Sequence, residues 1–339
     1  MVNMMINKIY EYIKKFIKEN YLFLIALTIL VILNVVKLPY EVMMPGGTID
    51  LTDRISVDGE AVDLKGSFNM AYVTVVQGSI PYVLLGSILP DWDVNKMSTE
   101  VYDKEVIEEE NLSNRLDLIH SKNAAKTAAF NAAKIDYKEG EHFNYVSLIL
   151  DEADTDLKVG DDINSVNGME LNDLNKMLDL IANSKEGDKL TFNITRDGKE
   201  MEAYAKVVKL NGELKIGVAV LPTSDVVSDI DIEINTKESE SGPSGGMMMA
   251  LMIYNAITNQ DLTNGKKVVG TGTIDKDGNV GEIGGIKFKV LGAEKRKADV
   301  FLVPEDNYED AMAIKKEKDL KIEIVKVKTL SDAVSYLEN

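Results

Sequence analysis

The longest apolar stretch of the chain lies near its N-terminus. Residues 20–36 carry no charge, and residues 21–33 are almost wholly apolar. This length is at the short end for a membrane-spanning helix, and Lys18 and Lys37 can extend their ammonium groups to the two interfaces. A cleaved signal peptide, which would give a secreted protein, is the alternative, but no small-residue cleavage site follows the apolar stretch. The pattern therefore favours an uncleaved anchor over residues 21–38.

Charge around this stretch predicts its orientation. Residues 1–20 contain four lysines and two glutamates. An excess of basic residues marks the cytoplasmic side of a membrane helix. We expect residues 1–20 to be a cytoplasmic tail of a single-pass cell-membrane protein, with everything from about residue 39 outside the cytoplasm.

Mixed patterns follow the anchor over residues 39–136. Met44-Pro45-Gly46-Gly47 is typical of a turn, and residues 71–76 have the alternation and β-branching of a strand. Residues 100–133 have a helical pattern with an acidic, solvated face. We expect an α/β connecting region here.

Short strands around one helix are predicted for residues 137–218. A turn and strand over residues 156–168 precede a helix over residues 171–181, and residues 190–198 form a hairpin turned by Asp197-Gly198. This order resembles a PDZ domain, a small β-sandwich or barrel module. The resemblance implies that an extended peptide adds to an exposed sheet edge, for which residues 145–150 are the candidate. The alternative for residues 145–150 is an ordinary core strand.

A nucleophile and a base are the candidates in the last third of the chain. Ser244 stands in Gly242-Pro243-Ser244-Gly245-Gly246 and precedes an apolar run, residues 247–257, that predicts a buried helix packed with methionines. Lys289 lies near the start of a second predicted helix. The helix dipole and burial both lower a lysine pKa, which makes available the neutral amine that accepts a serine proton. The sequence predicts a Ser-Lys dyad.

Each fragment of this pattern also has an ordinary explanation. Gly-Pro-Ser-Gly-Gly is common as a turn before a helix, and Lys287 and Lys289 could both be surface lysines. Four sequence motifs that occur in a fixed order are more specific than any single motif. They are residues 242–246, 270–274, 281–289 and 302–307. Because it contains these four motifs in order, the segment 219–339 resembles the proteolytic domain of the Lon protease family.

That resemblance implies roles for four residues. Ser244 is the nucleophile and Lys289 the general base. Thr271 corresponds to the threonine whose hydroxyl positions the lysine amine. Backbone amides around Ser244, with Gly245 as a supporting residue, contribute to oxyanion stabilisation. Substrate would lie extended beside residues 232–235.

Several positions depart from the ATP-dependent branch of that family. They are Glu240, Ser241, Gly245 and Thr273. The chain also has no Gly-x-x-x-x-Gly-Lys-Ser/Thr phosphate loop. We therefore expect peptide-bond hydrolysis through an acyl-enzyme without ATP.

Composition narrows the chemistry further. With 339 residues the chain has room for two or three domains, and the absence of cysteine excludes disulfides, metal-thiolate sites and a thiol nucleophile. His120 and His142, the two histidines, sit in no recognisable motif. We expect no metal and no cofactor. A net charge of −18 argues against a nucleic-acid partner.

The expected fold class is α+β and multidomain. A transmembrane helix, the connecting region, the PDZ-like module (137–218) and a Lon-type α/β proteolytic domain (219–339) follow one another. The expected function is a membrane-tethered serine endopeptidase acting on extracytoplasmic peptides or proteins, either as a monomer or as a homo-oligomer. The alternative is a catalytically silent, membrane-anchored PDZ adaptor.

Overall fold

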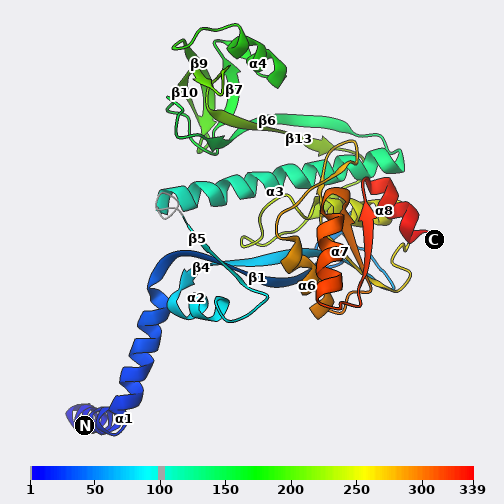
Figure 1. Cartoon of the computed structure of the whole chain (residues 1–339). Coiled ribbons are helices and arrows are strands. Elements are labelled where there is room, and N and C mark those ends of the chain that lie inside the picture. The colour runs from blue at the N-terminus through cyan, green and yellow to red at the C-terminus, as the bar shows by residue number, and fades with distance from the viewer. Residues whose placement is uncertain (1, 98–103) are drawn as a thin grey trace. The chain divides into compact units, whose positions relative to one another are not determined.

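The computed structural model describes residues 2–97 and 104–339 (Figure 1). The chain forms two compact units, one made of Met1–Met44 and Thr74–Tyr102 and the other of Pro45–Val73 and Asp103–Asn339. Strands β1 (Lys37–Asp50) and β4 (Ser67–Ser79) each have one end in each unit. Helices and strands are mixed throughout, which confirms the expected fold class.

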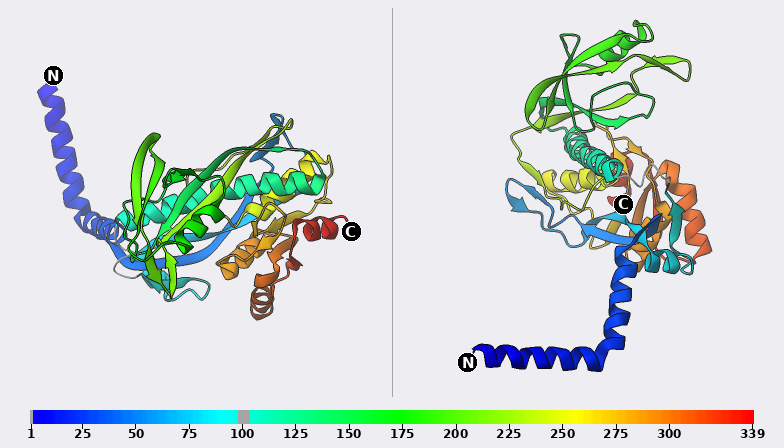
Figure 2. Two further views of the ribbon diagram at one scale, coloured as in Figure 1. Left: turned by 90° about the horizontal axis from the view of Figure 1, so that it is seen from above. Right: turned by 90° about the vertical axis from the view of Figure 1, so that its left-hand side faces the viewer.

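The first unit begins with a long, bent helix. α1 (Val2–Val35) has non-helical angles at Asn20 (φ −119°, ψ 18°), and the Asn20 side chain donates a hydrogen bond of 2.9 Å to the Phe16 carbonyl (Figure 2). A side chain that bonds the preceding turn in this way competes with the backbone and bends the helix. Within the described residues, α1 is the one helix long and apolar enough to cross a membrane. Its helical part ends at Val35, and the last residues of the expected span, 37 and 38, already belong to β1.

A short helix and a strand pair complete this unit. Residues 40–43 of β1 pair antiparallel with β5 (Asp93–Lys96). α2 (Ile80–Gly86) directly follows β4 and carries a proline in its first turn. Proline is favoured there because the amide it lacks would have no partner inside the helix.

A parallel sheet is the centre of the second unit. β4 pairs with β15, β15 with β18, and β18 with β19, all in parallel. The strands that follow β4 and the helices that alternate with them are β15 (Lys267–Gly270), α6 (Ile286–Lys295), β18 (Val300–Pro304), α7 (Tyr308–Glu317), β19 (Glu323–Val327) and α8 (Leu330–Leu337). Val268, Phe301 and Leu302 are fully buried, as expected for a sheet covered on both faces.

The predicted turn at Met44-Pro45-Gly46-Gly47 is wrong, because these residues lie inside β1. The glycines serve a close strand approach instead of a chain reversal. A Cβ atom on Gly46 would lie 2.0 Å from the carbonyl oxygen of Tyr72 in β4, a distance that no side chain tolerates.

Two helices from distant parts of the sequence share the main core. α3 (Lys104–Ala133) packs on α5 (Gly246–Ile257). On α3 the contact is made by small side chains, which let the two axes come close: Ala124, Ala125, Ala128 and Ala129. The three methionines 247–249 are fully buried against them, which confirms their predicted role in core packing.

The connecting region therefore contributes to the same core as the C-terminal part. Leu51, Phe68 and Phe130 belong to one cluster of buried side chains with α5 and α8. The domain boundaries expected from the sequence stay predictions, but residues 45–73 and 104–133 do not form a core apart from this one.

The PDZ-like region has its own sheet and core. Its strand order is β10-β9-β7-β6-β13, and α4 (Leu174–Ala182) contacts β12 (Glu213–Lys215) and shares the buried core of the region. The strands are β6 (Lys138–Ile149), β7 (Asp162–Val166), β9 (Lys189–Arg196), β10 (Lys199–Lys206) and β13 (Val218–Val227). The predicted hairpin turn is confirmed, since Asp197 and Gly198 both have positive φ (51° and 72°).

The predicted binding edge over residues 145–150 is wrong. β6 lies between β7 and β13, and residues 148 and 149 pair with β13. The outer strand at this side of the sheet is β13. Hydrophobic alternation could not separate the two strands, because both have apolar residues facing the same core.

Candidate active site

The loop that carries Ser244 is held by α3. The Gly242 amide donates to the Asn114 carbonyl (2.8 Å), and the Ser121 hydroxyl donates to the Pro243 carbonyl (3.1 Å). Gly242 has a positive φ of 86°, which favours glycine over other residues. Ser244 is thereby fixed just before α5, which begins at Gly246.

Two backbone amides beside the serine are available. In the part of the chain that the structure describes, the N–H groups of Ser244 and Gly245 have no hydrogen-bond acceptor. They precede the N-terminus of α5, where unpaired N–H groups and the helix dipole favour a negative charge. The pair could stabilise an oxyanion that forms on a carbonyl attacked by Ser244.

Thr271 links the lysine to the serine. Lys289 Nζ donates a hydrogen bond of 3.2 Å to Thr271 Oγ1, and that hydroxyl donates one of 3.0 Å to the Ser244 carbonyl oxygen. The Gly272 amide donates to the same carbonyl (2.8 Å). Three of the residues predicted from sequence are thus brought together by direct contacts, with Thr271 in the middle.

Burial changes the chemistry of Lys289. This lysine is the fourth residue of α6, and only 4% of its surface is exposed. Desolvation of the ammonium lowers the pKa of Lys289 from 10.5 to about 8. Among the described residues no carboxylate forms an ion pair with it. A neutral amine is therefore accessible close to physiological pH.

Asn307 fixes the loop that precedes α6, although no individual role was predicted for it from the sequence. Its Oδ1 accepts from the Ile283 amide (2.9 Å), its Nδ2 donates to the Ile283 carbonyl (3.0 Å), and the residue is buried. This two-way bond sets where α6 begins and so where Lys289 points. Its position in the fourth motif, residues 302–307, was the available signal.

Glu240 closes the nucleophile loop from its other end. Its carboxylate accepts from Arg54 (3.0 Å) and from the Lys237 amide (2.9 Å). Both side chains of the Arg54–Glu240 pair are largely shielded from solvent. The sequence left the role of Glu240 open, and its partner Arg54 is too distant in sequence to be recognised there.

Gly245 is accommodated by a neighbour from β4. A Cβ atom at this position would lie 2.7 Å from Met70 Sδ, the end of a flexible side chain. Because glycine has no Cβ atom, the Met70 side chain can occupy this space.

A second serine contacts a histidine at the surface. Ser224 Oγ lies 2.6 Å from His142 Nδ1, and Glu139 lies 3.9 Å from His142 Nε2. Ser224 and His142 face each other on the paired strands β13 and β6, and His142 is exposed. Neither burial nor a helix N-terminus supports this group, so it lacks the features found at Ser244.

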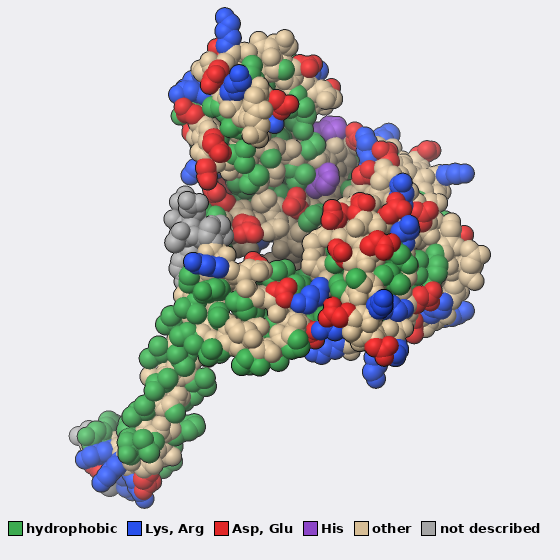
Figure 3. All heavy atoms as spheres, in the orientation of Figure 1, with side chains coloured by type: hydrophobic (Ala, Val, Ile, Leu, Met, Phe, Trp, Pro, Cys, Tyr) green, Lys and Arg blue, Asp and Glu red, His purple; other side chains and the backbone are tan. Residues whose placement is uncertain are grey.

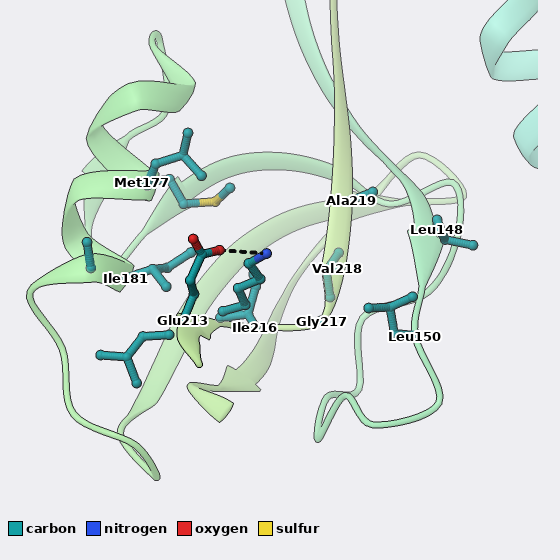
Figure 4. A pocket seen from close by; sticks show the side chains of 13 residues that line it. Leu148, Leu150, Met177, Ile181, Glu213, Ile216, Gly217, Val218 and Ala219 are labelled. Carbon is teal, nitrogen blue, oxygen red and sulfur yellow. Dashed lines mark ion pairs between the residues drawn. The ribbon is translucent and has the colours of Figure 1, made fainter. Parts of the chain in front are cut away.

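An apolar groove lies between α4 and β13 (Figure 4). Its volume is about 620 Å³. The groove is also lined by the Glu213–Lys215 ion pair of β12 (2.9 Å). The other lining side chains are apolar and come mainly from α4, from the end of β6 and from the segment that leads into β13: Leu148, Leu150, Met177, Leu178, Ile181, Ile216 and Val218. Within the described residues, the Ile216 and Gly217 amides have no acceptor. The sequence missed this segment because an isolated Ile-Gly-Val carries little signal.

Two family models match parts of the chain. Residues 213–337 match the model of the Lon protease (S16) C-terminal proteolytic domain, and residues 150–207 match that of the PDZ domain.

Individual relatives cover parts of the chain. A Lon protease of Aster yellows witches'-broom phytoplasma is 30% identical over 34% of this chain and 14% of its own length. Lon protease 2 of Bacillus subtilis is 32% identical over 44% of this chain and 28% of its own length. The chain thus spans less than a third of either relative. The PDZ domain of an SdrC-like protein from Listeria monocytogenes is 25% identical, with 23% of this chain and 86% of that chain covered and a TM-score of 0.22.

Replacing Lys289 by methionine should stabilise the fold in a pH-dependent way. Because the folded-state pKa is lowered from 10.5 to about 8, the unfolded chain binds the proton more tightly, so the wild type loses stability as the pH falls from 10.5 to about 8 and carries the full penalty below that. Lys289→Met should raise the free energy of unfolding by about 2–3 kcal/mol at neutral pH. The gain should shrink as pH rises from about 8 towards 10.5.

Denaturant unfolding of the detergent-solubilised chain at several pH values measures this effect. Lys287→Met is the matched control and should give no pH-dependent gain. An equal gain at every pH for Lys289→Met would contradict a buried, titrating lysine.

Proposed function

With residues 213–337 forming a Lon-type (S16) proteolytic domain and residues 150–207 a PDZ domain, we propose that the chain is a membrane-tethered endopeptidase. It hydrolyses peptide bonds of extracytoplasmic peptides or proteins, and it does so without ATP. The observation that carries this proposal is the buried Lys289 amine, joined through the Thr271 hydroxyl to the backbone of Ser244.

The reaction follows from these contacts. Neutral Lys289 takes the hydroxyl proton of Ser244 as its oxygen attacks the substrate carbonyl. The Ser244 and Gly245 amides hold the oxyanion, and Lys289 then protonates the leaving amine. Water, deprotonated by Lys289, hydrolyses the acyl-enzyme and regenerates the serine. Thr271 acts as a positioning residue that keeps the amine beside the nucleophile.

Substrate has a strand edge beside the serine. β14 (Ile232–Ile234) pairs with β2 (Ile55–Val57) on one side only, and it is the end strand of its small sheet. An extended peptide can add to the other side through main-chain hydrogen bonds, which hold a chain independently of its sequence. The loop from this strand leads directly to Ser244.

The groove between α4 and β13 supplies a second peptide contact. A peptide C-terminus fits there with its last side chain among Leu148, Met177 and Ile181, and with its carboxylate at the free Ile216 and Gly217 amides. This groove would raise the local concentration of substrate without taking part in the chemistry.

A silent PDZ adaptor is the competing function. It would need the groove but not the buried lysine. An ammonium without a counter-ion costs folding free energy, and an adaptor gains nothing in return. The burial of Lys289 therefore favours the enzyme.

Loss of either dyad residue should abolish proteolysis. Ser244→Ala and Lys289→Ala should each lower the rate by about a thousandfold or more, and the double variant should lose little beyond that because the two act as a unit. Wild-type activity should rise with pH through a midpoint of about 8. Cleavage of a fluorescently labelled unfolded protein, without nucleotide, measures this.

Lys287→Ala, two residues away on α6, is the control and should keep its activity. Lys289→Arg should stay inactive, because arginine remains protonated. Turnover by the arginine variant, or a strict need for ATP, would contradict the proposed mechanism.

A charge in the groove should reduce selectivity and leave the chemistry intact. Leu148 is 54% exposed, so Leu148→Asp should fold normally while repelling an apolar peptide terminus. We expect kcat/KM to fall by about tenfold for a peptide ending in an apolar residue and its carboxylate, and to stay unchanged for the same peptide with an amidated, polar end. Met201→Asp, at a site on β10 that is 43% exposed, is the control. Equal losses for both peptides would mean that the domain supports the active site structurally.

External protease tests the proposed topology. The lysine-rich segment before the apolar part of α1 favours a cytoplasmic N-terminus. Protease added to intact cells or protoplasts should digest residues after 38 and spare an epitope tag placed before residue 20. A protected C-terminal domain with a digested tag would reverse the orientation.

A further inference from the structure

The first unit has an apolar surface beyond its long helix. No charged residue occurs between Lys65 and Asp91, in a chain of which 28% is charged. α2 and the turn after it expose Leu84 (59%), Leu85 (47%) and Ile88 (77%). α2 packs against α1, and hydrophobic side chains cover much of α1 and of the surface next to its end (Figure 3). An exposed apolar patch of this kind on a folded chain marks a contact surface.

The length of α1 indicates what covers this patch. After the bend at Asn20, residues 21–35 span about 22 Å at 1.5 Å per residue. The hydrocarbon core of a bilayer is about 30 Å thick. The uncharged part of α1 after the bend is therefore shorter than this core, although Met5–Val35 as a whole is long enough to cross it, so apolar surface next to Val35 can lie within reach of the lipid.

We propose that α2 and the turn after it, residues 80–90, lie in the interfacial layer of the bilayer that α1 spans. Lipid is the occupant that matches an uncharged surface continuous with a membrane helix. Tyr82 and Trp92 stack with ring centroids 6.2 Å apart, and such amphipathic rings prefer the level of the headgroups. Asp91 and Asp93 are the first charged residues after this segment and end the uncharged stretch. This inference rests on the membrane anchoring in the proposed function.

The contact would give the unit two attachments to the membrane instead of one. α1 enters the bilayer, and α2 lies along its surface, so the unit cannot swivel freely about the chain at Val36. The ends of β1 and β4 that belong to this unit would then be held at the membrane surface.

Trp92 reports on this contact because it is the only tryptophan in the chain. The full chain is reconstituted in phosphatidylcholine vesicles, with or without lipids brominated close to the headgroup. We expect blue-shifted Trp92 emission that the brominated lipids quench. Leu84→Glu and Ile88→Glu should each shift the emission to the red and remove most of the quenching. Met201→Glu, an exposed apolar residue on β10, should change neither.

The outcomes separate this inference from the anchor itself. Resistance of the chain to carbonate extraction reports on α1, and endopeptidase activity reports on the dyad. A chain that resists extraction while Trp92 is unquenched would overturn the lipid contact and leave the anchor standing. A blue shift that the brominated lipids do not quench, and that increases with the protein-to-lipid ratio, would also overturn the lipid contact. A second copy of the chain would then cover the patch. Ile88→Ser provides a milder variant, and unchanged quenching in both Ile88 variants would count against the proposal.

Discussion

The candidate active site depends on the burial of one ammonium group. Lys289 is enclosed on α6 with a hydroxyl as its partner and no counter-ion among the described residues. A charge in that position is costly, and the cost is what makes its neutral form accessible. The surrounding structure has to resist the tendency of such a lysine to turn towards solvent. The bond between Asn307 and Ile283 at the start of α6 and the largely buried strands β15 and β18 provide that resistance.

The nucleophile depends on a different support. α3 reaches the Ser244 loop through Asn114 and Ser121, and it fills the core behind α5 with alanines. A helix from the first half of the chain thus sets the position of a serine in the second half. A change on α3 would act on the reaction without touching substrate, because it would move the loop that carries Ser244.

Local patterns in the sequence were sufficient for several of the elements, whereas the dyad stays a prediction. The apolar run after Gly246 predicted α5, and Asp197-Gly198 predicted a hairpin turn, since in both cases nearby residues decide the conformation. Thr271 contacts both Lys289 and the Ser244 carbonyl, and the roles of these three residues stay predictions.

The features that depend on contacts between residues far apart in the sequence were not predicted. Gly46 and Gly47 suggested a turn because glycine permits one, whereas the structure uses Gly46 to admit the Tyr72 carbonyl of another strand. The free sheet edge is β13 and not β6, which only the order of strands reveals. The Arg54–Glu240 pair joins residues 186 positions apart. None of these relations leaves a periodic signal in the sequence.

The methionines of α5 have a consequence for how the protein ages. Met247, Met248 and Met249 are fully buried directly behind Ser244, in a chain without cysteine. Oxidants reach a thioether only when it is exposed, and a sulfoxide is too polar to return to a dry core. Each transient opening of this core in an oxidising environment could therefore become permanent. The sulfoxides at these three positions would accumulate as a chemical record of how often the catalytic core has unfolded.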